Sequence, residues 1–337
     1  MWFSSKKQKV AQQDTTKILA DVLSNGIELS IEELIQYQSK TSLINLVAAK
    51  NLHSKMSGNY LARSKGRGME FDEVRHYQNG DDIRAIDWRV TARTGETHTK
   101  LFKEEVERPV LIATDLSENM LFGSQLLFKS VQAAHLAALV AWHAKSRGDR
   151  VGGIVFNQHS HAELKPRSRL QGVLHYLHIL AQMHEKSLQN LTISTKDRQT
   201  QVNSTFDENC GRIRQLAKPG SLVYLITDGY HLTAESIRHL ANITRHCELV
   251  VCLITDPLEH DLPDSAQKLN VAVTDGKHRQ QFTLGDDKVA ARYSEQAAHI
   301  NKNKEDLLSK AGARILNFSA GEALETQLKN GVASWNR

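Results

Sequence analysis

The sequence predicts an α/β protein with a doubly wound, mainly parallel sheet, preceded by an N-terminal helix and a small antiparallel β unit. Three observations predict this class. The run Val110–Thr114 is continuously apolar, as in a strand buried on both faces. From Pro109 onward, strand-like and helix-like segments alternate, which indicates crossover connections between parallel strands. Upstream, Asn79-Gly80 separates two strand-like segments and is a strong hairpin signal.

Residues 1–67 form an N-terminal segment that carries one helical pattern and the net charge. Apolar residues recur at helical spacing from Ser30 to about Leu52, and Ser30 with Glu33 three positions later is a capping-box start. Residues 53–68 are polar and predict a basic loop. The segment has ten Lys or Arg against five Asp or Glu, so the excess of +5 lies wholly here. So small an excess, without a recognition motif, predicts no nucleic-acid partner.

Residues 68–108 form a second segment, in which charged strand-like stretches alternate with turn signals. The expected strands are Glu70–Tyr77, Ile86–Thr94 and Thr97–Val106. We therefore expect a small antiparallel β unit with mixed charge on its exposed face.

Residues 109–337 form the α/β domain itself. The expected strands after the first are 151–156, 222–227, 248–255, 270–273, 280–283 and 314–317. The expected helices are 125–147, 169–184, 208–217, 234–244, 287–311 and 321–330. This order predicts one large sheet with helices on both faces.

The bulk properties indicate a soluble, cytoplasmic chain. Apolar residues make up 40% and charged residues 24%, which is ordinary for a globular protein. The three cysteines have no C-x-x-C spacing, as expected in a reducing compartment. The longest apolar stretch, Leu126–Ala144, is interrupted by Lys129, Gln132, His135 and His143, so we expect a buried helix and no membrane insertion. The N-terminus lacks the pattern of a signal peptide.

Two acids stand at the ends of predicted strands. Asp115 follows the first buried strand in Asp115-Leu116-Ser117-Glu118-Asn119, and Asp228 follows another strand in Thr227-Asp228-Gly229. Ligands of doubly wound sheets bind at the carboxyl ends of strands, so the two carboxylates converge on one crevice if these strands are neighbours. The alternative is that both acids only cap helices.

This arrangement resembles the von Willebrand factor A domain with its metal-ion-dependent adhesion site. That family places Asp-x-Ser-x-Ser after its first strand, a Thr in a second loop and an Asp in a third. Asp115, Ser117 and Asp228 fit the pattern, Asn119 stands where the second Ser is expected, and Ser187 lies roughly where the Thr belongs. The resemblance implies a Mg²⁺ site of these five residues, because hard oxygen ligands suit Mg²⁺. A partner's carboxylate would complete it.

A second resemblance lies ahead of the sheet. The pattern consists of Glu70-Phe71, Arg75-His76-Tyr77, Gly80-Asp81-Asp82-Ile83-Arg84-Ala85-Ile86-Asp87-Trp88 and Ala92-Arg93. It is similar to the signature of the bacterial domain-of-unknown-function 58 (DUF58) family. Members are commonly encoded beside MoxR-type AAA+ ATPases, so the resemblance implies an adaptor or chaperone-like assembly role with such an ATPase.

The charges of this signature permit two interpretations. Its arginines and acids can form paired, bidentate contacts that fix the β unit as a scaffold, with Trp88 as an anchor whose indole N–H finds an acceptor. Alternatively, some of them form a docking surface, because isolated surface pairs add only about 0–1 kcal/mol to stability. The residues concerned are Arg75, Asp81, Asp82, Arg84, Asp87, Trp88 and Arg93.

Together these patterns favour a non-enzymatic interaction module. The alternative is a metal-dependent phosphohydrolase or nuclease that uses Asp115 and Asp228, although no motif supplies its base or its phosphate-binding cation. A metal-free scaffold is a third possibility. A zinc site at His159, His161 and Glu163 is only weakly indicated, and no phosphate loop or nucleophile elbow occurs.

Overall fold

The computed structural model describes residues 15–44, 69–104, 108–191, 199–263, 269–274 and 279–330. Two compact units divide the chain: residues 51–108 form one, and residues 1–50 with 109–337 form the other. The second half of the helix expected up to Leu52, and the basic loop at residues 53–68, lie outside the described residues.

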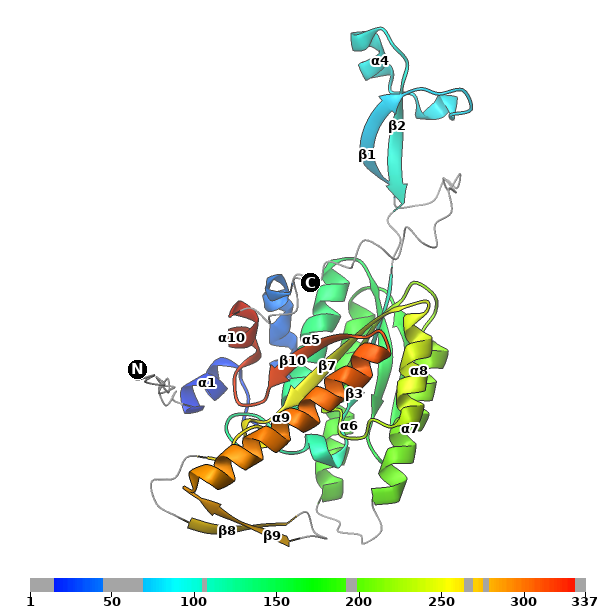
Figure 1. The fold of residues 1–337 in the computed structure, drawn as a ribbon. Helices are drawn as coiled ribbons and strands as arrows, with labels where there is room; N and C mark the ends of the chain where they lie inside the picture. The colour runs from blue at the N-terminus through cyan, green and yellow to red at the C-terminus, as the bar shows by residue number, and fades with distance from the viewer. Residues whose placement is uncertain are drawn as a thin grey trace, which may run out of the picture. The chain divides into compact units, whose positions relative to one another are not determined.

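The larger unit is a three-layer α/β domain (Figure 1). Its strands are β3 (Pro109–Asp115), β4 (Arg150–Phe156), β5 (His161–Arg167), β6 (Leu222–Thr227), β7 (Glu248–Thr255), β8 (Leu269–Thr274), β9 (Arg279–Leu284) and β10 (Arg314–Ser319). Its helices are α1 (Thr15–Asp21), α2 (Ile31–Ile35), α5 (Lys129–Ser146), α6 (Arg169–Leu191), α7 (Gln199–Leu216), α8 (Ala234–Thr244), α9 (Asp287–Lys310) and α10 (Leu324–Lys329), with 3-10 turns η1 (Gln36–Leu43), η3 (Glu118–Met120) and η4 (Pro257–Glu259).

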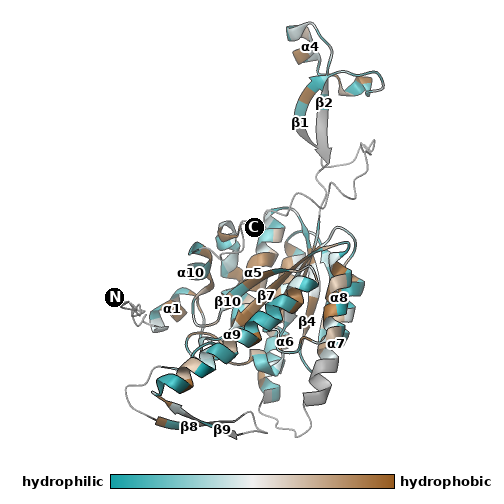
Figure 2. Cartoon of the chain, viewed as in Figure 1, coloured by the Kyte–Doolittle hydropathy of each residue, from teal (hydrophilic) through white to brown (hydrophobic). Residues whose placement is uncertain are grey.

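Six strands form the central sheet in the order β10-β7-β6-β3-β4-β5, and β8 and β9 form a separate hairpin. All neighbours in the sheet are parallel except β4 and the edge strand β5. The predicted fold class is therefore confirmed. Residues of β3 alternate between the two faces: Val110 and Ile112 pack with α5 and α6, whereas Leu111 and Ala113 pack with α7 and α8. Figure 2 shows the resulting apolar colour of the central strands and the polar exterior of α9.

Helix α5 is buried nearly all round, because the N-terminal segment covers the side that faces away from the sheet. Trp142 Nε1 donates to the carbonyl oxygen of Leu34 at 3.1 Å, and Leu34 and Tyr37 are fully buried. The predicted capping box is confirmed, since Ser30 accepts from the Glu33 N–H and Glu33 accepts from the Ser30 N–H. Regular α-helix ends at Ile35, earlier than expected, and continues as η1. Among the described helices, none is both long and apolar enough to cross a bilayer.

The smaller unit, by itself, is a two-stranded antiparallel sheet with two short helical turns. Strand β1 (Met69–His76) pairs with β2 (His98–Glu104), and η2 (Ile83–Ala85) and α4 (Trp88–Thr94) lie in the connection. The strand expected at residues 86–94 is wrong, and so is its hairpin at Asn79-Gly80. Asp87 accepts hydrogen bonds from the N–H groups of Arg89 and Val90, and this cap starts a helix that ends at Gly95 in the left-handed conformation.

Candidate functional site

The switch point of the central sheet lies between β3 and β6. From β3 the chain proceeds through β4 to β5 at one edge, whereas from β6 it proceeds through β7 to β10 at the other. In open α/β sheets, ligands bind outside the carboxyl ends of the strands at this point. Asp115 ends β3 and Asp228 directly follows β6, and the two strands are hydrogen-bonded neighbours. The structure therefore brings both acids to one edge of the sheet, which we call the strand-end site.

Asp115 is completely buried and held by two donors. Its Oδ1 accepts from the Ser117 N–H at 3.0 Å, and its Oδ2 accepts from Thr227 Oγ1 at 2.8 Å. Burial raises the pKa of Asp115 above its ordinary value, and the charge of Asp228 raises it further, whereas hydrogen bonds from Ser117 and Thr227 act in the opposite direction. The two carboxylates at these neighbouring strand ends therefore repel one another when both are charged.

The pKa of Asp228 shifts in the opposite direction from that of Asp115, because a lysine ammonium lies beside Asp228. Its Oδ2 accepts from Lys129 Nζ at 2.9 Å, and its Oδ1 accepts from the Tyr230 N–H at 2.9 Å. Burial alone would raise the pKa of Asp228, but the Lys129 charge and these hydrogen bonds outweigh it and lower the pKa below its usual range. Asp228 is therefore ionised at neutral pH.

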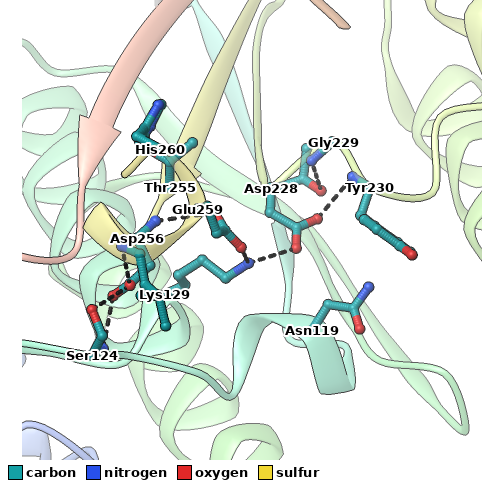
Figure 3. A network of polar contacts seen from close by, with 12 residues as sticks. Asn119, Ser124, Lys129, Asp228, Gly229, Tyr230, Thr255, Asp256, Glu259 and His260 are labelled. Atoms are coloured by element: carbon teal, nitrogen blue, oxygen red, sulfur yellow. Dashed lines mark hydrogen bonds and ion pairs between the residues drawn. The ribbon is translucent and has the colours of Figure 1, made fainter. Parts of the chain in front are cut away.

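Lys129, the first residue of α5, is 2% exposed and lies between two carboxylates (Figure 3). Its ammonium also donates to Glu259 Oε1 at 2.6 Å. Burial would lower the pKa of Lys129, but the charges of Asp228 and Glu259 raise it above its ordinary value. The lysine therefore remains charged, and it joins the start of α5 to the loop after β6 and to η4.

Of the other residues expected at the metal site, Ser117 lines one cavity with Asp115, whereas Asn119 and Ser187 bond other residues. Ser117 is buried at the N-cap position of η3, where its side chain makes no capping hydrogen bond and its hydroxyl has no hydrogen-bond partner among the described residues. The amide nitrogen of Asn119 lies 3.3 Å from Nε2 of His231. The Ser187 hydroxyl, on α6, accepts from Asn157 Nδ2 at 2.9 Å and donates to a backbone oxygen one turn earlier, so both of its hydrogen-bonding roles are satisfied away from Asp115.

Lys129 already places a positive charge on Oδ2 of Asp228, and this charge opposes a Mg²⁺ ion on the same oxygen. A Mg²⁺ ion about 2.1 Å from Oδ2 of Asp228 would lie within about 5 Å of the ammonium, since that oxygen is 2.9 Å from Nζ. At an effective dielectric constant of about 20, the repulsion between a divalent and a monovalent cation at about 5 Å is about 7 kcal/mol. Among the described residues, no group of three or more His, Cys, Asp or Glu could hold a metal. Mg²⁺ at Asp115 stays a prediction from the sequence.

The zinc candidates His159, His161 and Glu163 lie on or beside the edge strand β5. His161 Nε2 lies 3.9 Å from Glu163 Oε1, and Arg212 approaches the same oxygen at 3.5 Å. His159 is exposed, and its backbone N–H donates to Asn157. These contacts are those of an edge strand, β5, with ordinary surface pairs.

In the smaller unit, the acids of the signature hold turns. Asp81 accepts from Arg75 Nη2 at 2.8 Å and from the Gln78 N–H at 2.9 Å. The Gln78 hydrogen bond, with Arg75, lowers the pKa of Asp81. Asp82 caps η2 and Asp87 caps α4. Asp81, Asp82, Asp87 and Arg75 thus stabilise the turns of the smaller unit, as in the scaffold interpretation.

The remaining signature residues are exposed. Within the smaller unit, the side chains of Ile83 and Trp88 are 65% and 67% exposed, so Trp88 is not buried by that unit itself. Arg84, Arg89 and Arg93 are also exposed, and within the described residues their guanidinium groups have no hydrogen-bond or ion-pair partner. We call Ile83, Arg84, Trp88, Arg89 and Arg93 the Arg/Trp surface.

Sequence reasoning missed three members of the strand-end site: Lys129, Thr227 and Glu259. One signal for Lys129 was available, because a lone lysine in an otherwise apolar helix must find a buried carboxylate. It also stands at a helix N-terminus, where the helix dipole disfavours a cation. Thr227 and Glu259 carried no such signal, since only the sheet order shows which loops meet.

Comparisons with known proteins identify relatives and structural neighbours of this chain. The uncharacterized protein Rv1480 of Mycobacterium tuberculosis is 24% identical over 221 residues, which are 66% of this chain and 66% of the relative's own length. Among solved structures, the conserved hypothetical protein BatB from Bacteroides thetaiotaomicron has a TM-score of 0.34 at 14% identity, covering 61% of this chain and 98% of that one. A von Willebrand factor type A protein from Catenulispora acidiphila has a TM-score of 0.25 at 10% identity, covering 47% and 35%.

The family model that matches is the protein of unknown function DUF58, over residues 73–305. The match begins in strand β1 and ends within α9, so it spans the Arg/Trp surface and both carboxylates of the switch point. On this match, which covers more than half of the sequence, the chain belongs to the DUF58 family.

Proposed function

We propose that this chain is a non-enzymatic adaptor that binds a protein partner through the Arg/Trp surface, and that the partner is a MoxR-type AAA+ ATPase. The observation that carries the proposal is the 67% exposure of Trp88, which the smaller unit itself does not bury. An exposed tryptophan on so short a helix contributes little to folding. It is available to a partner.

The chemistry of the surface suits a protein interface. Tryptophan and arginine are enriched among residues that dominate binding energies, because they combine large apolar area with directional hydrogen bonding. Asp82 and Asp87 are occupied as caps, so the charge that the Arg/Trp surface itself presents is that of Arg84, Arg89 and Arg93. The matching patch on the partner is therefore acidic, with an apolar position opposite Trp88.

The strand-end site supports the same functional class less directly. Tyr230 follows Asp228 and is 60% exposed, and Phe122 is 39% exposed. These aromatic side chains stand close to the charge network in which Lys129 pairs with Asp228 and Glu259. The phosphohydrolase alternative needs metal on Asp115 and Asp228, and the ammonium beside Asp228 gives it no support.

The test is direct binding between the purified chain and the purified MoxR-type ATPase of the same organism, measured by biolayer interferometry. We expect Trp88→Ala to weaken binding at least about tenfold, and Arg84→Ala/Arg93→Ala to weaken it and to reduce its salt dependence. Tyr230→Ala is the matched control, because it removes a similarly exposed aromatic ring from the other unit.

Each outcome decides one part of the proposal. Loss of binding in Trp88→Ala alone supports the Arg/Trp surface. Loss only in Tyr230→Ala moves the interface to the strand-end site and overturns this surface. Wild-type chain that does not bind the ATPase at low salt overturns the partner assignment.

A further inference from the structure

Lys129 is the most deeply buried ammonium group among the described residues of the strand-end site. Its side chain is 2% exposed, and it stands at the first position of α5. A charge in this position is unfavourable twice over, since burial removes its water and the helix N-terminus carries partial positive charge. Such a lysine persists only where carboxylates compensate it, and here Asp228 and Glu259 do so at 2.9 Å and 2.6 Å.

The acids that hold Lys129 are themselves fixed by the loops that carry them. Glu259 uses its second oxygen to accept from the Asp256 N–H at 3.1 Å, which closes the capping box of η4. Asp256 in turn accepts from the Ser124 N–H at 2.8 Å. These bonds form one continuous network from the segment before α5 to the end of β7 (Figure 3).

A second lysine completes the positive side of the network. Lys304 of α9 donates to the backbone oxygen of Asp228 at 3.0 Å. The loop after β6 thus receives two ammonium groups, one on its side chain and one on its backbone. A bound divalent ion would have the same structural effect, because it would draw loops from separate strands onto one positive centre.

We infer that Lys129 is the resident cation of the strand-end site, so that its ammonium joins the loops after β6 and β7 to α5 and the site needs no divalent metal. This inference is independent of the proposed function, because it concerns a different unit and makes no use of a partner. The sequence led us to expect a Mg²⁺ ion that holds these loops together; in this inference the Lys129 ammonium holds them instead.

The test measures melting temperature in EDTA and in about 10 mM MgCl₂, a concentration that would load a millimolar site. Wild-type protein should melt within about 1 °C of the same temperature in both buffers. Lys129→Met keeps the stem and removes the charge, and it should lower Tm by about 10 °C, because Asp228 is left buried and unpaired. Lys145→Met, on the same helix but only partly buried, should leave Tm unchanged.

A double variant separates loss of charge pairing from loss of packing. In Lys129→Met/Asp228→Asn the buried carboxylate is also neutral, so we expect at least half of the lost Tm to return. If the double variant is no more stable than Lys129→Met, the ammonium acts only as a space-filling stem and the inference fails.

Isothermal titration calorimetry of wild-type protein with MgCl₂ tests whether the site binds Mg²⁺, and it does so even if Lys129→Met does not fold. We expect no heat beyond dilution. One Mg²⁺ ion bound per chain, with binding lost in Asp115→Ala, would show a metal beside the lysine and overturn the inference. A Mg²⁺-dependent rise in wild-type Tm that Asp115→Ala abolishes would do the same.

Discussion

Glu33 and His135 are 102 positions apart, yet Oε1 of Glu33 lies 2.5 Å from Nε2 of His135, and both side chains are buried. The same carboxylate closes the capping box of α2 through the Ser30 N–H. One acid therefore both starts a helix and docks it on α5. This contact makes the N-terminal segment part of the α/β domain.

Glu33→Ala should lower the free energy of unfolding by about 2–4 kcal/mol, because it leaves the buried imidazole of His135 without its partner. Glu33→Gln can still hydrogen-bond and should cost about 1 kcal/mol. Urea denaturation measures both, and the exposed neighbour Glu32→Ala serves as control. Equal stability of Glu33→Ala and Glu32→Ala would contradict the docking role.

Leu34→Ala tests the apolar side of the same contact. Leu34 is fully buried against α5, so the truncation leaves a cavity and should cost about 2–5 kcal/mol. Ile35→Ala is the matched control, since this side chain is 39% exposed and its loss should change stability by less than about 1 kcal/mol. Urea midpoints that move equally in both variants would show that α2 is not packed.

Stability should depend on pH through His184. Burial lowers the pKa of His184 from its ordinary value of 6.5 to about 4, and the charge of Glu33 opposes this only in part. Between these values the unfolded chain binds a proton that the native protein does not, so stability falls as pH falls from about 6.5 to about 4 and changes no further below that. The shift corresponds to a loss of about 3 kcal/mol.

The comparison that isolates this effect is His184→Gln, which can still hydrogen-bond Ser130 but does not titrate. Its unfolding free energy should decline less than that of wild type over the same pH window. His159→Gln replaces an exposed histidine and should keep the wild-type slope. Parallel curves for wild type and His184→Gln would refute the assignment.

Gly153→Ala should be severely destabilising. Gly153 has φ of +155° beside a bulge in the β4–β5 pairing, and an added Cβ would lie 1.9 Å from the carbonyl oxygen of Ile112. Backbone of a central strand cannot move aside cheaply, so we expect a loss of at least about 3 kcal/mol or no folded protein. Circular dichroism and urea denaturation check this.

Gly211→Ala is the matched control within a helix. The nearest atom to its added Cβ is at 3.5 Å, an ordinary contact, so the change should raise stability by about 0.5–1 kcal/mol. A destabilised Gly211→Ala would mean that glycine substitutions in this chain cannot be read from local space alone.

The sequence predicted the central sheet well, because β3, β6 and β7 are buried on both faces and are therefore continuously apolar. Strand β5 escaped prediction, since it is an edge strand with charged residues and Pro166. Helix α4 was mistaken for a strand because a single cap, Asp87, outweighed the strand-like composition after it.

The strand-end site shows a different limit. Asp115 and Asp228 could be predicted to converge, because each ends a strand and the rule for switch points concerns strand ends. That Lys129 pairs with Asp228 and Glu259 could not, since the pairing depends on the loop after β7. The resemblance to a metal site pointed to Asp115 and Asp228, but it gave no indication that the positive charge beside Asp228 is the ammonium of Lys129.

The insertion of residues 51–108 into the larger unit has a consequence for synthesis. Leu34 hydrogen-bonds Trp142, 108 positions later, and cannot be covered until α5 has been made. At translation rates of about 5–20 residues per second, roughly 5–20 s pass between the synthesis of α2 and that of Trp142. The apolar side of α2 has no α5 to pack against during this time. During that interval Leu34 and Tyr37 are exposed and can bind chaperones. We therefore expect the yield of folded protein in the cell to depend on chaperone binding to the nascent N-terminal segment.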